Sequence, residues 1–272
     1  MKKRWLLTMT AALATVFLLA GCAEKKDENE LRIGMEAGYA PFNWTQSTDA
    51  NGAVKISGDS DFAGGYDVEI AKKIAEGMGK KPVIVKIEWD GLVPALTSGK
   101  IDIIVAGMSP TDKRKESIDF SDNYYKSNLV MVVKKGSAYE NASSIQDFGG
   151  AKITAQLNTF HYTVIDQING VSKETAMDNF PAMRVALESG IIDGYVSERP
   201  EGISASAANP NLAMVEFEDG FVTSDDDTSI AVGVKKGSGL TSQINEILAG
   251  IPEDERTQIM DSAIQNQPAA QE

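Results

Sequence analysis

Cysteine and histidine are nearly absent from this 272-residue sequence. It contains one cysteine, Cys22, and one histidine, His161. A disulfide within the chain is therefore impossible, and no zinc site of cysteine and histidine ligands can be built. A serine–histidine–aspartate site would have to use His161, and no nucleophile-elbow motif accompanies it. We expect neither a metal nor a cofactor.

Basic side chains and long apolar runs are also scarce. The sequence has 26 Lys and Arg residues against 39 Asp and Glu residues, a formal net charge of −13. A surface this acidic repels phosphate backbones and anionic lipids, so nucleic acid is not an expected partner. Beyond the first 21 residues, no apolar run approaches the roughly 20 residues that a membrane-spanning helix needs.

The first thirty residues have the order of a secretory signal. Met-Lys-Lys-Arg opens the chain, residues 5–20 carry no charge, and small residues precede Cys22. A membrane-spanning anchor is the alternative, but the uncharged run is short and is interrupted by Thr8, Thr10 and Thr15. We therefore predict a signal peptide over 1–21.

The segment Leu-Ala-Gly-Cys at 19–22 resembles the lipobox of bacterial lipoproteins. That resemblance implies that Cys22 becomes the new N-terminus and carries lipid, whereas an unmodified exposed thiol outside the cytoplasm would be a liability. Residues 23–30 are highly charged and lack the apolar groups to fold. We expect residues 22–30 to tether a lipid-anchored protein to the outside of the cytoplasmic membrane.

The rest of the chain alternates strand and helix patterns, which predicts an α/β fold with mostly parallel sheets. Asp67, Asp90 and Pro181 are expected near helix starts, and residues 45–60 are expected to form a loop. Strands are predicted at 31–35, 82–89, 101–106, 128–134, 152–155, 191–196, 212–217 and 229–234, and helices at 67–78, after 90, 159–168, 181–190 and 240–248. The pattern restarts near 150, which suggests two lobes, and residues 265–272 are expected to be loose.

Ligands of open α/β sheets bind beyond the carboxyl ends of the strands, so the residues there are candidates. An acid and three aromatic residues follow the first strand, and one aromatic residue follows the second: Glu36, Tyr39, Phe42, Trp44 and Trp89. These aromatic residues also fit a structural role at the edge of the core. Both interpretations remain open from composition alone.

Polar groups follow three later strands. They are Gly107, Met108, Ser109 and Arg114 after the third strand, Gln156, Asn158 and Thr159 after residue 155, and Glu198 after residue 196. A guanidinium grips a carboxylate with two parallel bonds, and a helix N-terminus near Thr159 also suits an anion. The alternatives are a solvated basic loop, a helix cap and an exposed ion pair of Glu198 with Arg199.

Taken together, these groups match the two ends of a free amino acid. Arg114 with Ser109 and Thr159 suits an α-carboxylate, and Glu198 suits an α-ammonium. Tyr39 and Trp89 offer flat faces for a side chain.

Several ordered motifs resemble those of the amino-acid-binding proteins of ATP-driven (ABC) importers, the type that includes the lysine/arginine/ornithine and histidine binders. They cover nearly all of residues 30–250. They are Tyr-Ala-Pro-Phe at 39–42, Gly-Tyr-Asp-Val-Glu-Ile at 65–70, Trp-Asp-Gly-Leu-Val-Pro-Ala-Leu at 89–96, Ile-Asp-Ile-Ile-Val-Ala-Gly-Met-Ser at 101–109 and Ile-Asp-Phe-Ser-Asp-Asn-Tyr-Tyr at 118–125.

The resemblance implies a two-lobed periplasmic-binding-protein fold of type II, with the ligand between the lobes. The first lobe would take 30–125 and 233–265, the second 133–223, the hinge strands 126–132 and 224–232, and a loose tail 266–272. It implies ligand contacts from Arg114, Ser109, Thr159, Glu198, Tyr39 and Trp89. Many relatives have Asp at the position of Glu198, and Asn158 replaces a usual small residue. The implied partner is a membrane permease, and the protein is expected to be a monomer.

Glu36 falls where binders of basic amino acids place an acid, which motivates the hypothesis that the ligand is arginine or lysine. A neutral side chain would leave a buried carboxylate unpaired. Glu36 facing solvent is the alternative. Two other classes of function remain open: a sensor that presents ligand to a receptor, and an enzyme of the dehydratase kind with Glu198 as its acid. We favour a binding protein over an enzyme because the carboxylate and ammonium contacts are both present.

Overall fold

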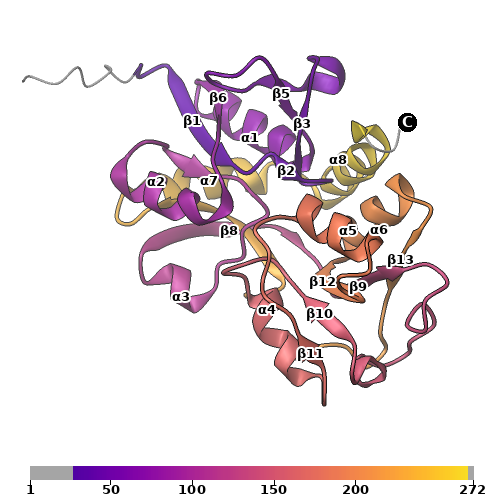
Figure 1. The fold of residues 1–272 in the computed structure, drawn as a ribbon. Helices are drawn as coiled ribbons and strands as arrows, with labels where there is room; N and C mark the ends of the chain where they lie inside the picture. Colours follow the sequence, from indigo (N-terminus) through magenta and orange to yellow (C-terminus); the bar gives the residue numbers. More distant parts are fainter. Residues whose placement is uncertain (1–26, 269–272) are drawn as a thin grey trace, which may run out of the picture.

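The computed structural model describes residues 27–268, and these residues form two α/β lobes that lie side by side (Figure 1). Each lobe is built around one five-stranded sheet. The predicted fold class is therefore confirmed. Among residues 27–268, no helix has the length and apolar character needed to cross a membrane. The predicted signal peptide and Cys22 lie outside the described residues.

The first sheet has the strand order β6-β1-β7-β14-β8. These strands are β6 (Lys81–Lys86), β1 (Glu30–Met35), β7 (Ile103–Ile104), β14 (Ser229–Lys235) and β8 (Ile118–Lys126). β1 pairs in parallel with β6 and β7, whereas β14 pairs antiparallel with β7 and β8. The first lobe comprises this sheet, the small sheet described below and the four helices α1 (Tyr66–Gly77), α2 (Leu92–Ser98), α3 (Asp112–Lys115) and α7 (Leu240–Ala249).

The second sheet repeats this arrangement in the order β11-β10-β12-β9-β13. Its strands are β11 (Ser172–Lys173), β10 (Lys152–Thr154), β12 (Gly194–Glu198), β9 (Leu129–Lys134) and β13 (Leu212–Val215). β10 pairs in parallel with both neighbours, and β9 pairs antiparallel with both of its own. The second lobe comprises this sheet with α4 (Phe160–Val164), α5 (Phe180–Glu188) and α6 (Arg199–Ala208).

Four of the five strands in each sheet run in the same direction, as expected, and one strand in each, β14 in the first and β9 in the second, runs against them. The chain leaves the first sheet after β8, enters the second at β9, and returns between β13 and β14. A strand that arrives from the other lobe without a crossover helix runs against its neighbours. This is why β9 and β14 are antiparallel to the strands beside them.

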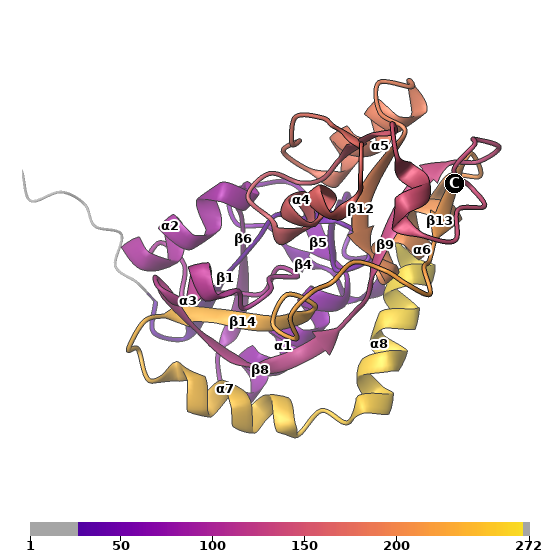
Figure 2. The same cartoon turned by 90° about the horizontal axis from the view of Figure 1, so that it is seen from below.

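The helix α8 (Glu253–Asn266) follows α7 and was not predicted. It contacts α1 of the first lobe and α6 of the second (Figure 2). Its sequence is strongly polar, with few apolar positions to reveal a buried side. Directly after it, Gln267 is 1% exposed, so the expectation of a loose chain from residue 265 is wrong as far as Gln267.

Local differences from the sequence prediction have simple causes. The segment 45–60 is not one loop, because it contains the end of β3 (Asn43–Gln46) and all of β4 (Val54–Lys55). These strands belong to a small antiparallel sheet of order β2-β3-β5-β4, with β2 (Gly38–Tyr39) and β5 (Phe62–Gly64). Gly65, with φ 121°, precedes α1 in place of the expected cap. Asp67 instead points into the core, where its carboxylate accepts hydrogen bonds from Asn43 and Tyr124, both at 2.7 Å.

Candidate functional site

A small cavity lies between the two lobes, at the carboxyl ends of their parallel strands. Its volume is about 10 Å³, which is room for about one water molecule. Both lobes contribute to its wall, which consists of Tyr39, Trp89, Gly107, Ser109 and Arg114 from the first lobe and Gln156, Thr159, Phe160, His161 and Phe180 from the second. Typical small-molecule pockets hold roughly 300–1,000 Å³, so a ligand requires the walls to separate.

Arg114 supplies the positive charge of this cavity. It lies on α3, with its guanidinium 4.9 Å from the ring centre of Trp89, a cation–π contact. Nη1 donates to the carbonyl oxygen of Ser109 at 2.9 Å, and Nη2 donates to that of Asn158 at 3.3 Å. Burial lowers the pKa of Arg114 to about 10, so the side chain remains a cation at neutral pH.

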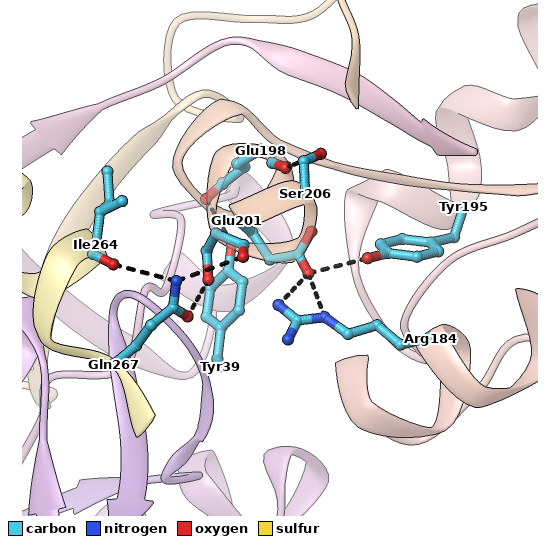
Figure 3. A network of polar contacts seen from close by, with 10 residues as sticks. Tyr39, Arg184, Tyr195, Glu198, Glu201, Ser206, Ile264 and Gln267 are labelled. Atoms are coloured by element: carbon cyan, nitrogen blue, oxygen red, sulfur yellow. Dashed lines mark hydrogen bonds and ion pairs between the residues drawn. The ribbon is translucent and has the colours of Figure 1, made fainter. Parts of the chain in front are cut away.

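Glu198 supplies a negative charge beside the same cavity. It ends β12 directly before α6 and is 1% exposed. Its Oε2 accepts a hydrogen bond from the Tyr39 hydroxyl at 2.7 Å, across the lobe boundary (Figure 3). Burial, and next the charge of Glu198, raise the pKa of Tyr39 well above its usual range, so the phenol keeps its proton. Oε1 lies 3.6 Å from Nε2 of His161.

Glu36 lies next to this cavity but does not line it. It follows β1, and its two carboxylate oxygens accept from Gln156 Nε2 at 3.1 and 3.3 Å, again across the lobe boundary. Glu36 lines a neighbouring pocket of about 410 Å³ that also includes Trp44 and Arg184. Burial raises the pKa of Glu36 to about 7, although the hydrogen bond from Gln156 opposes that shift. The interpretation of Glu36 as a solvent-facing acid does not fit its 6% exposure.

Tyr39 occupies the centre of an aromatic stack that joins the lobes. Its ring stacks on Phe42 of the first lobe at 4.9 Å between centres and on Phe180 of the second at 4.4 Å. Gly107 has φ +61°, and an added Cβ there would lie 2.6 Å from the Tyr39 ring. Glycine at this position therefore permits both the backbone turn and the close approach of the ring.

The hydroxyls predicted to hold a carboxylate are bonded to backbone oxygens in this structure. Ser109 Oγ donates to the carbonyl of Asp227 at 2.9 Å, and Thr159 Oγ1 donates to that of Gln156 at 2.7 Å. Thr159 occupies the cap position of α4, but its side chain makes no capping hydrogen bond. With five residues, α4 is also too short to favour anion binding at its N-terminus through a helix dipole.

Besides Glu36 and Glu198, four of the predicted residues do not line the cavity wall. Phe42 and Met108 are buried in the core of the first lobe, at 0% and 1% exposure. Trp44 lines the larger neighbouring pocket, where its Nε1 donates to Gln46 at 2.7 Å. Asn158 is exposed and donates from Nδ2 to Asp90 at 2.9 Å, which adds a bond between the lobes.

Sequence reasoning missed three residues of the wall: Phe160, His161 and Phe180. The first two directly follow Thr159, and the uniqueness of His161 in the sequence was the available signal. Phe180 follows no predicted strand and only opens α5, so no local pattern marked it. Its place against Tyr39 depends on how the lobes meet.

A buried charged network lies on α6, three residues after Glu198. Glu201 on α6 accepts from Arg184 Nη2 at 2.8 Å and from the Tyr195 hydroxyl at 3.0 Å (Figure 3). Glu201 is fully buried, so the pairing with Arg184 offsets a desolvation cost. Within residues 27–268, no group of three or more acidic, histidine or cysteine side chains is placed to hold a metal ion.

Comparison with known proteins gives consistent similarities. Residues 31–265 match the sequence profile of the bacterial extracellular solute-binding proteins, family 3. A probable histidine-binding protein of Campylobacter jejuni is 31% identical over 77% of this chain and 79% of its own. An arginine-binding extracellular protein of Bacillus subtilis is 28% identical over 90% and 91%.

Solved structures of amino-acid-binding proteins also have a fold similar to that of this chain. A crystal structure of an amino acid ABC transporter substrate-binding protein of Streptococcus pneumoniae, bound to L-arginine, superposes with a TM-score of 0.74 at 25% identity. The match covers 90% of this chain and 97% of that one. A structure described as an ancestral arginine-binding protein bound to arginine has a TM-score of 0.70 at 31% identity, over 86% and 97%.

Proposed function

The chain belongs to family 3 of the bacterial extracellular solute-binding proteins, and from this membership we propose that it captures a free amino acid and delivers it to an ABC importer. The observation that carries the proposal is a pair of opposite charges beside one interlobe cavity. Arg114 comes from the first lobe and Glu198 from the second. A zwitterion offers a carboxylate to the guanidinium and an ammonium to the acid.

We propose a basic ligand, arginine or lysine. Relatives named for arginine and histidine, and the arginine-bound neighbours, support this choice. Glu36 supports it independently, because a buried carboxylate with one amide partner gains most from a cationic side chain. Tyr39 and Trp89 would flank the aliphatic part of that side chain.

The proposed mechanism is closure of the lobes around the ligand. The lobes must first separate, because the cavity of about 10 Å³ holds no amino acid, and the ligand ammonium would then replace the Tyr39 hydroxyl at Glu198. An amino acid held by Arg114 and Glu198 contacts both lobes and so stabilises the closed state. The chain crosses between the lobes at residues 127–128, between β8 and β9, and again between β13 and β14. These crossings, which overlap the expected hinge segments 126–132 and 224–232, would act as the hinges.

We further propose that the mature protein is a monomeric lipoprotein. Signal removal before Cys22 and lipidation of that residue would hold the protein at the outer side of the cytoplasmic membrane, near its permease. The ligand-loaded closed form would dock on the permease. No chemical conversion of the ligand is part of this function.

The test is calorimetric titration of the wild type and Arg114→Ala with Arg, Lys, His, Gln and Glu. We expect Arg or Lys to bind tightest and Arg114→Ala to lose at least about a hundredfold in affinity, since removing one charge partner strands the ligand carboxylate. Lys113→Ala, an exposed neighbour on α3, is the control and should bind like the wild type. Binding of Arg114→Ala within tenfold of the wild type would refute the role of Arg114. Tightest binding to Gln or Glu would refute the basic ligand.

A further inference from the structure

His161 is a buried polar side chain that neither the sequence motifs nor the proposed ligand contacts account for. It is the sequence's single histidine, is 6% exposed, and lines the interlobe cavity from α4. Within residues 27–268, neither of its ring nitrogens has a hydrogen-bond partner. An unpartnered buried polar group costs free energy that an apolar residue would avoid. We therefore expect the imidazole to form a hydrogen bond at the cavity when a ligand is bound.

The carboxylate of Glu198 lies close to this imidazole. Nε2 of His161 lies 3.6 Å from Oε1, slightly beyond hydrogen-bond distance, while the other oxygen accepts from Tyr39. The carboxylate is thus flanked by a phenol of the first lobe and an imidazole of the second. The other charged group of the cavity, Arg114, donates to backbone carbonyls and makes no hydrogen bond with Glu198.

We propose that His161 is a positioning residue for Glu198. When a ligand ammonium replaces the Tyr39 hydroxyl at Oε2, the Nε2–H of His161 donates to Oε1 and holds the carboxylate toward the ligand. A glutamate has one more rotatable bond than an aspartate, so this position needs an additional donor to fix the acid. This inference rests on the proposed function and assigns the α-ammonium selectivity of the site to His161 acting through Glu198.

The test compares two ligands across three variants by calorimetry. The ligands are L-arginine and 5-guanidinopentanoic acid, which is arginine without its α-ammonium. His161→Phe keeps a buried ring of similar size beside Phe160 but removes the donor. We expect it to weaken L-arginine binding about tenfold, as for a hydrogen bond to a charged group, and to change the binding of the deamino analogue less than twofold.

Two further variants separate positioning from packing. His161→Gln restores a donor near the place of Nε2 and should recover most of the L-arginine affinity. Tyr162→Phe, on the same short helix, removes a hydroxyl that donates to the Glu174 carbonyl at 3.0 Å, and should leave both ligands unaffected. Equal weakening of both ligands by His161→Phe, or no weakening of either, overturns the inference.

A spectroscopic readout tests the proton directly. Because the sequence holds one histidine, ¹⁵N-labelled protein prepared without a histidine tag gives a single pair of imidazole signals. With L-arginine bound, we expect a proton on Nε2; an Nε2 without a proton overturns the inference. Failure of the wild type to bind any amino acid would instead refute the proposed function, and this inference with it.

Discussion

Three ionisable side chains between the lobes hydrogen-bond to groups of the opposite lobe. Glu198 accepts from Tyr39, Glu36 accepts from Gln156, and the guanidinium of Arg114 reaches the Asn158 carbonyl. Because burial penalises charge, the pKa of Glu36 rises to about 7. A ligand must replace these protein–protein bonds with bonds of equal or greater strength.

The raised pKa of Glu36 predicts a pH dependence for a cationic ligand. Arginine favours the ionised carboxylate, so its affinity should rise as pH increases through about 7. Between pH 6 and 8 the ionised fraction rises about tenfold, and we expect a similar gain in affinity. Calorimetry across this range measures the gain, and Glu36→Gln should bind more weakly with a flat profile. A flat profile in the wild type would contradict the pairing of Glu36 with a cation.

The same group makes an opposite contribution to folding. Its folded pKa lies above the unfolded value of 4.5, so the stability it contributes is present below that value and is lost as pH rises through about 7. Above pH 7, Glu36→Gln should therefore raise the melting temperature of the ligand-free protein.

At the scale of elements, α8 connects the two lobes independently of the hinge crossings. It packs on α1 of the first lobe and ends against α6 of the second. There the amide of Gln267 accepts from the Ser204 hydroxyl and donates to the Ile264 carbonyl at 3.2 Å (Figure 3). These bonds are buried, so their loss leaves polar groups without partners.

We predict that Gln267→Ala lowers the free energy of unfolding by about 1–2 kcal/mol, because buried polar groups lose their partners. This corresponds to about 2–8 °C in the melting temperature of a chain of this size. Gln265→Ala, an exposed position on the same helix, is the matched control and should change little. Equal melting temperatures for wild type and Gln267→Ala would show that the contact with α6 does not stabilise the fold.

At the scale of the whole molecule, the proposed import role requires that the protein is held at the membrane beside its permease. The signal pattern and Cys22 precede the described domain, and a polar segment separates them from β1. We predict that Cys22→Ser abolishes metabolic labelling with palmitate and releases the protein from membranes, while purified protein keeps its affinity for amino acids. Palmitate incorporation into the Cys22→Ser protein would refute lipidation at this residue.

Much of the fold was predictable from local pattern. The alternation of strands and helices indicated the α/β class, and the core strand and helix positions around 31–35, 67–78 and 229–234 agree with β1, α1 and β14. These elements repeat a buried face at regular spacing, which a sequence displays directly. In contrast, α8 has only a weak apolar stripe, so its pattern did not reveal a helix. The short strands β3 and β4 were also missed, because both are held in place by pairing with β5.

The sequence by itself determined the two-lobed class, the acidic surface charge and the candidate residues at the strand ends, because composition, periodicity and ordered motifs are local properties. Only the tertiary structure decided which groups meet. Tyr39 reaches Glu198 across 159 positions and Gln156 reaches Glu36 across 120, while His161 and Phe180 join the same cavity. These pairings depend on how the two lobes pack together, and no short stretch of sequence contains that information.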